Sequence, residues 1–190
     1  MKILKGLLLI IPVLTFSQEV IKCKDSTNFI LNKIDKEYLS IKVKGNIDKT
    51  ENPKVLVLNG NIIIQTLINK KKDNNENGND EIAILATYVL KEGNYYSSIF
   101  EKKVDLAIFP VDLENSKKAL FWHFDLPKNK SKNDDVDATK SVFISIVKNE
   151  NIYTIGTTLF QNQKLEVLEK LLISLIKTVE QKPNNQNLCK

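Results

Sequence analysis

Short apolar segments joined by tight turns recur through most of this 190-residue chain, and they limit its fold more than any other feature. At 38–44, Leu39, Ile41 and Val43 alternate with polar residues, which is the pattern of a strand with one buried and one solvent-exposed face. The apolar segments 55–58 and 62–68 flank Asn59-Gly60-Asn61, a sequence typical of a type I′ hairpin turn. Strands joined by such turns pair antiparallel, so a parallel doubly wound sheet is disfavoured.

The second half of the chain predicts two more hairpins. The segment 104–113 precedes a turn at 114–117 and a strand at 118–126, and Pro110 places the first of these strands at a sheet edge or a bulge. Strands at 139–148 and 152–160 form the third hairpin. Together these patterns predict an antiparallel sheet of about seven strands.

Two helices complete the predicted α+β fold. The first runs from a cap at Asn79 or Asp80 to Glu92 and stops at Gly93, although the continuous apolar run 82–90 leaves a strand as the alternative. The second is an amphipathic helix that begins after a cap at Asn162 and continues to Gln181. Its apolar stripe consists of Leu165, Leu168, Leu172, Leu175, Ile176 and Val179, and the macrodipole suits Lys177 and Lys182 near its end.

The segment 18–35 has no clear period. Phe29, Ile30 and Ile34 fit either a short helix that opens at Ser26 or packed coil. Residues 95–103 are undetermined as well, and they could extend the helical region after a break at Gly93-Asn94.

Residues 1–17 have the three-part layout of a secretory signal peptide. Lys2 and Lys5 precede an apolar run at 6–16, and Ser17 supplies a small residue before the cut. The run has about eleven residues, whereas a membrane-spanning helix needs ~20, so no transmembrane anchor should remain after cleavage. A retained anchor or a buried N-terminal element is the alternative. The expected organisation is a signal peptide (1–17), a single domain (18–182) and a flexible tail (183–190), with the mature protein periplasmic or extracellular.

The charge pattern disfavours nucleic acid as a partner. The net charge is +5, and removal of Lys2 and Lys5 lowers it to 5 − 2 = +3. All 28 basic residues are lysines, so the chain lacks the arginine that makes bidentate contacts to phosphate and guanine. The run Lys70-Lys71-Lys72 leads directly into an acidic, asparagine-rich stretch, which is typical of a solvated loop.

Two cysteines, Cys23 and Cys189, lie near the two ends of the mature chain. In an oxidising compartment they can form a disulfide, because the termini of a compact domain often lie close together. Two unbridged thiols in mobile tails are the alternative. Cys23 follows Lys22 instead of a small residue, which disfavours lipid attachment.

His123, the single histidine, lies two residues before Asp125, so a strand would place both on one face. Such a pair can orient an imidazole for general-base chemistry, but a half-buried histidine with an ordinary ion-pair partner is the preferred interpretation. No Gly-x-Ser-x-Gly motif accompanies the pair. One histidine and two terminal cysteines are too few for a typical zinc site, and the acidic residues Asp134, Asp135 and Asp137 lack the other features of an EF-hand, so we expect no metal or cofactor.

Aromatic residues on neighbouring predicted strands offer a second kind of site. If they shared an exposed sheet face, they would suit an apolar ligand or a partner protein, while packing against the final helix explains them equally well. These residues are Trp122, Phe124, Tyr153 and Phe160.

The order of the last elements resembles the C-terminal end of PsbP/Mog1-like domains, as found in small exported bacterial proteins. The resemblance covers 104–181 and lies in the segments 119–127, 141–148 and 152–160 followed by the amphipathic helix. It implies an α/β/α sandwich around an antiparallel sheet and an accessory or binding role, and it assigns no functional residue.

From these patterns we expect an exported, non-enzymatic accessory or binding protein of the bacterial envelope, whose partner is an envelope protein or an apolar ligand. A secreted hydrolase that uses His123 and Asp125 is one alternative. A periplasmic immunity or inhibitor protein is another.

Overall fold

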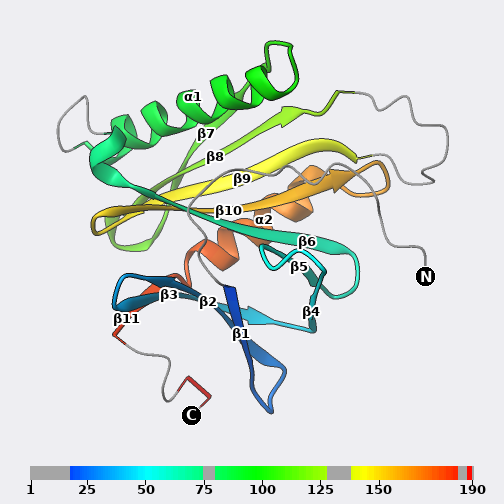
Figure 1. Cartoon of the computed structure of the whole chain (residues 1–190), viewed down its shortest axis with the longest axis vertical. Helices are drawn as coiled ribbons and strands as arrows, with labels where there is room; N and C mark the ends of the chain where they lie inside the picture. Colours follow the sequence, from blue (N-terminus) through cyan, green and yellow to red (C-terminus); the bar gives the residue numbers. More distant parts are fainter. Residues whose placement is uncertain (1–17, 75–79, 128–137, 184–187, 190) are drawn as a thin grey trace.

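The computed structural model describes residues 18–74, 80–127, 138–183 and 188–189. Within them the chain forms two sheets and two α-helices (Figure 1). The strands are β1 (Gln18–Lys22), β2 (Thr27–Ile34), β3 (Glu37–Lys44), β4 (Ile47–Lys49), β5 (Val55–Leu58), β6 (Ile62–Lys70), β7 (Ala107–Asp112), β8 (Lys118–Asp125), β9 (Ala138–Lys148), β10 (Asn151–Phe160) and β11 (Glu180–Lys182). The helices are α1 (Glu81–Ile99) and α2 (Leu165–Ile176), with short 3-10 turns at η1 (Lys71–Asn74) and η2 (Glu114–Ser116).

The larger sheet has seven strands in the order β4-β5-β6-β10-β9-β8-β7, and all neighbours are antiparallel. The predicted hairpin between β5 and β6 is confirmed, because Asn59 and Gly60 both have positive φ, at 51° and 76°. Pro110 lies on β7, which is an edge strand as predicted. The strand predicted at 38–44 is present as β3, but it belongs to the smaller sheet. The edge of the large sheet opposite β7 is formed by β4.

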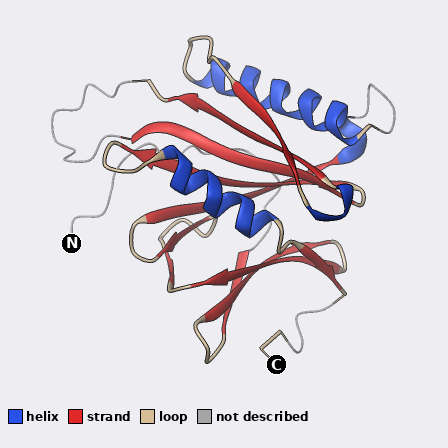
Figure 2. Cartoon of the chain, turned by 180° about the vertical axis from the view of Figure 1, so that it is seen from behind, coloured by secondary structure: helices blue, strands red, loops and turns tan. Residues whose placement is uncertain are grey.

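Each face of the large sheet is covered by different elements. Helix α1 covers one face, and α2 lies on the other beside the four-stranded sheet β1-β2-β3-β11 (Figures 1 and 2). Two apolar cores correspond to these two faces: one joins Tyr88 and Tyr96 of α1 to Trp122, and the other joins Leu172 of α2 to Phe121 and the small sheet. The α+β class predicted from the sequence is therefore confirmed.

The segment 18–35 forms strands β1 and β2, so the expectation of a short helix or coil was wrong. The alternation was hidden because a polar residue, Asn32, stands on the inward face of β2 between Ile30 and Ile34. Its side-chain amide donates to the Tyr153 hydroxyl at 2.7 Å, which satisfies the buried group. Asn32 thereby links the small sheet to the large one.

Helix α1 confirms the helical interpretation of 82–90, with Asp80 as its cap: the Asp80 carboxylate accepts from the Ile82 amide at 3.0 Å. The predicted stop at Gly93 was wrong, because the helix continues to Ile99. Gly93 is buried inside the helix, where a Cβ atom would approach Leu106 Cδ1 to 2.4 Å. This glycine allows the chain after α1 to pack closely against the helix.

Helix α2 is shorter than predicted at both ends. It begins at Leu165 after Lys164 rather than after Asn162, and it ends at Ile176. The chain then turns, and residues 180–182 form β11, which pairs with β3. Lys182 therefore lies on a strand and not near the helix end.

The disulfide between Cys23 and Cys189 is present, with Cα atoms 5.4 Å apart and a sequence separation of 166. Cys23 lies between β1 and β2, and Cys189 follows β11, so the bridge fastens both ends of the chain to the small sheet. Of the two helices in the described part of the chain, neither is long and apolar enough to span a membrane.

Candidate functional site

His123 and Asp125 lie on one face of β8, as predicted, but each has its own environment. The half-buried His123 ring lies 6.0 Å from each of the Phe109 and Phe121 rings, centroid to centroid. Asp125 is exposed and forms an ion pair with Lys140, the residue directly opposite it on β9. Both cysteines form the bridge, so neither offers a thiol nucleophile to this histidine.

Electrostatics favour the neutral form of His123. Burial lowers the pKa of its imidazole, the Lys140 ammonium lowers it further, and Asp125 acts in the opposite direction. A neutral imidazole that stacks on Phe109 is consistent with a packing role at the margin of the sheet.

The His123 pKa should respond in opposite directions to its two charged neighbours. Replacing Lys140→Gln should raise the pKa, because a positive charge is removed, and Asp125→Asn should lower it. An NMR titration of the imidazole protons measures both shifts. If the two variants moved the pKa in the same direction, the electrostatic environment described above would be wrong.

Of the two interpretations of the four aromatic residues, core packing is confirmed and an exposed binding face was wrong, because all four are buried. Trp122 and Phe124, however, pack under α1 and not against the final helix. The ring of Trp122 stacks on that of Phe143 with centroids 4.2 Å apart, and the ring centroid of Phe124 lies 4.7 Å from that of Tyr96 on α1. Tyr153 points to the opposite face and accepts from Asn32, while Phe160 is only 8% exposed at the end of β10. The large apolar area of such side chains is more stabilising when it is buried than on a surface.

A chain of buried polar groups lies under α1. The Trp122 indole donates to Ser145 Oγ at 3.0 Å, Ser145 shares a hydrogen bond with Thr154 at 2.8 Å, and Thr154 Oγ1 donates to the Tyr88 hydroxyl at 3.3 Å. Glu92 lies one helical turn beyond Tyr88, and its buried Oε2 has no hydrogen-bond partner. Burial raises the pKa of Glu92 to about 7.

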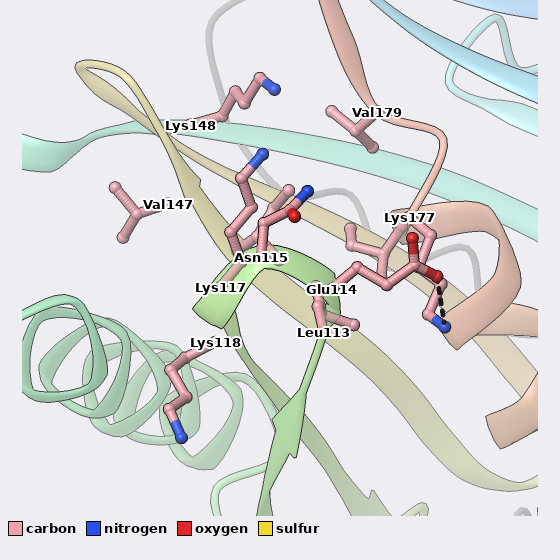
Figure 3. A pocket seen from close by; sticks show the side chains of 11 residues that line it. Leu113, Glu114, Asn115, Lys117, Lys118, Val147, Lys148, Lys177 and Val179 are labelled. Carbon is pink, nitrogen blue, oxygen red and sulfur yellow. Dashed lines mark hydrogen bonds and ion pairs between the residues drawn. The ribbon is translucent and has the colours of Figure 1, made fainter.

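A concave feature lies at the end of the β7–β8 hairpin, at the opposite end of β8 from Asp125. It is a pocket of about 110 Å³ between the η2 turn, strand β9 and the C-terminal end of α2 (Figure 3). It has an apolar floor and a rim that carries three lysines and one glutamate. The floor includes Leu113, Ile146, Ile176 and Val179, and the rim consists of Glu114, Asn115, Lys117, Lys148 and Lys177. The side chains of Val147 and Lys118, on the same strands, point away from this space (Figure 3).

None of these pocket residues was singled out from the sequence as a site residue; Ile176, Lys177 and Val179 were assigned only to the final helix. Lys117 lies in a correctly predicted turn and Lys148 at the end of a correctly predicted strand, but their proximity depends on the register of β8 against β9. Strands β8 and β9 are separated in sequence by residues 126–137, and no local sequence signal fixes the register between them. The predicted signal peptide and the acidic residues Asp134, Asp135 and Asp137 lie outside the described residues. In the part of the chain that is described, no three His, Cys, Asp or Glu side chains gather closely enough to hold a metal ion.

Comparison with known proteins adds no assignment to this geometry. No protein-family model matches the chain, and no curated protein has a significantly similar sequence.

Proposed function

We propose that this chain is an exported accessory or binding protein of the bacterial envelope that acts without covalent catalysis. The observation that carries the proposal is the Cys23–Cys189 disulfide between the two ends of the mature chain. Structural disulfides persist in secreted and periplasmic proteins and are rare where cellular thiols are kept reduced. The signal-peptide pattern of residues 1–17 supports the same compartment.

The layering of the domain supports a relationship to PsbP/Mog1-like domains. That resemblance implies helices on both faces of an antiparallel sheet, and α1 and α2 lie on opposite faces of the seven-stranded sheet (Figures 1 and 2). In this proposal the four-stranded sheet, with its disulfide, is an addition to the sandwich. Such a relationship favours binding over catalysis.

Affinity purification of the tagged protein from its own envelope fraction tests the proposal. We expect the protein in that fraction and a partner that survives stringent washing. We also expect His123→Ala to retain the same partner, because His123 is a packing residue at the sheet margin. Recovery of the protein from the cytoplasm would contradict export, and turnover of a substrate that is lost in His123→Ala would instead favour the hydrolase alternative. A toxin as the captured partner would identify the protein as an immunity or inhibitor protein.

A further inference from the structure

The pocket at the end of the β7–β8 hairpin is shaped by a left-handed turn. Asn115 and Ser116 have φ of 59° and 58°, and the Lys117 amide donates back to the Glu114 carbonyl at 3.4 Å. Asparagine tolerates this conformation better than most residues. The turn directs the Asn115 amide and the Lys117 side chain into the same space beside Lys148 and Val179 (Figure 3).

Two lysines in this pocket face each other without a charge between them. The β8–β9 register pairs Ala119 with Ile146, and continuing it by two residues places Lys117 opposite Lys148. Like charges directly opposite each other on neighbouring strands are destabilising. Elsewhere on the same hairpins the opposed charges are complementary: Lys118 pairs with Asp112, and Lys140 with Asp125.

The nearby carboxylates are already engaged. Glu114 is exposed and pairs with Lys177 at 3.4 Å, and Glu180, which attracts Lys148 from outside the pocket, pairs with Lys182 at 2.6 Å. Within the described residues neither Lys117 nor Lys148 forms an ion pair of its own. Burial lowers the pKa of the half-buried Lys148, and the adjacent Lys117 lowers it further.

We infer that this pocket binds a phosphate group between Lys117 and Lys148, with the Asn115 side-chain amide as a further donor. A lysine ammonium is a compact point charge that binds phosphate well, and a bound anion would offset the repulsion between the two lysines with two attractions. A volume of about 110 Å³ has room for one small oxyanion and part of the group that carries it. The apolar floor favours a phosphate ester, whose carbon atoms can lie against Leu113 and Val179.

This inference goes beyond the proposed function and does not depend on it, because phosphate binding is measurable on the purified protein. The free mature protein is titrated with inorganic phosphate and, at equal ionic strength, with chloride, and backbone amide shifts are followed by NMR. We expect saturable shifts at residues 114–118 and at Lys148 with phosphate only.

Matched variants test which lysines bind. Lys117→Gln should weaken phosphate binding at least tenfold, and because Lys117 is exposed, the variant should keep the fold. Lys148→Gln should have the same effect. Lys164→Gln is the control: Lys164 and Lys177 flank the two ends of α2, so they lie about 20 Å apart along the helix, and this variant should bind as the wild type does.

A second arm distinguishes free phosphates from lipid headgroups. Sedimentation with vesicles of phosphatidylglycerol, compared with vesicles of phosphatidylcholine, tests whether a membrane phosphate is bound. Binding to phosphatidylglycerol that is lost in Lys117→Gln but kept in Lys164→Gln supports the pocket with the headgroup as its source. If neither phosphate nor vesicles bind, or if Lys117→Gln and Lys164→Gln bind equally, the inference is wrong.

Discussion

Replacing both Cys23 and Cys189 by serine should lower the free energy of unfolding by up to about 5 kcal/mol. The bridge joins residues 166 positions apart, so it closes most of the 190-residue chain into one loop. Closing a loop of this length lowers the conformational entropy of the unfolded chain, and the folded state loses this relative advantage when the bridge is absent.

For a domain of this size that loss corresponds to a fall in Tm of about 10–20 °C. Thermal or denaturant unfolding of the wild type and of the double variant measures it. Cys23→Ser alone should have the same effect as the double change, because either substitution removes the bridge, and reduced wild type should match both. A double variant within about 1 kcal/mol of the oxidised wild type would show that the bridge does not constrain the unfolded chain as described.

The second large effect should come from Glu92→Gln, which should stabilise the protein at neutral and alkaline pH. Glu92 lies on the inner side of α1 between Tyr88 and Tyr96, and its Oε2 has no partner. Burial raises the pKa of this carboxyl to about 7 from an ordinary value of 4.5. The folded state therefore holds a proton that the unfolded chain has already released between these two pH values.

The direction of the pH dependence follows from that difference. A raised carboxyl pKa contributes stability that is complete below pH 4.5 and is lost as the pH rises to about 7. A shift of this size corresponds to about 3 kcal/mol. Glu92→Gln should thus exceed the wild type by up to that amount at pH 8, and the two free energies of unfolding should converge near pH 4.5.

Denaturant titrations at several pH values between 4 and 8 measure the difference. The control is Glu81→Gln, on the same helix but exposed at its first turn, which should change the free energy of unfolding by less than about 1 kcal/mol. A constant difference between Glu92→Gln and the wild type across this range would mean that Glu92 remains ionised in the folded protein.

The elements with strong local signals were predictable from the sequence. Asn59-Gly60 supplies the positive φ that its hairpin turn requires. Pro110 has no backbone N–H to donate, so it fits an edge strand, whose outer side pairs with no neighbouring strand. The three hairpins, the helix after Asp80 and the amphipathic stripe of α2 follow from the same kind of local chemistry. The disulfide was one of two alternatives, and the structure shows the bridge.

The features that were missed depend on contacts between distant segments. Asn32 looked like a break in a pattern because its partner, Tyr153, lies on the other sheet. Gly93 looked like a helix stop because Leu106, which needs the space, comes later in the chain. Trp122 is equally compatible with a core and with a surface until the position of α1 is known.

The candidate pocket was missed for the same reason. A lysine-rich chain offers many pairs of positive charges, and only the three-dimensional register brings Lys117 and Lys148 together. The repulsion between them is a property of the folded protein and has no counterpart in the local sequence.

The most direct test of export and of the Cys23–Cys189 disulfide is mass spectrometry of the native protein, purified from its own cells without a reducing agent. Its intact mass is measured and its peptides are mapped by tandem mass spectrometry. We expect a chain that begins at Gln18, lacks residues 1–17 and contains one bridged peptide pair carrying Cys23 and Cys189. A native protein that retains Met1 and has two alkylatable thiols would contradict both export and the disulfide.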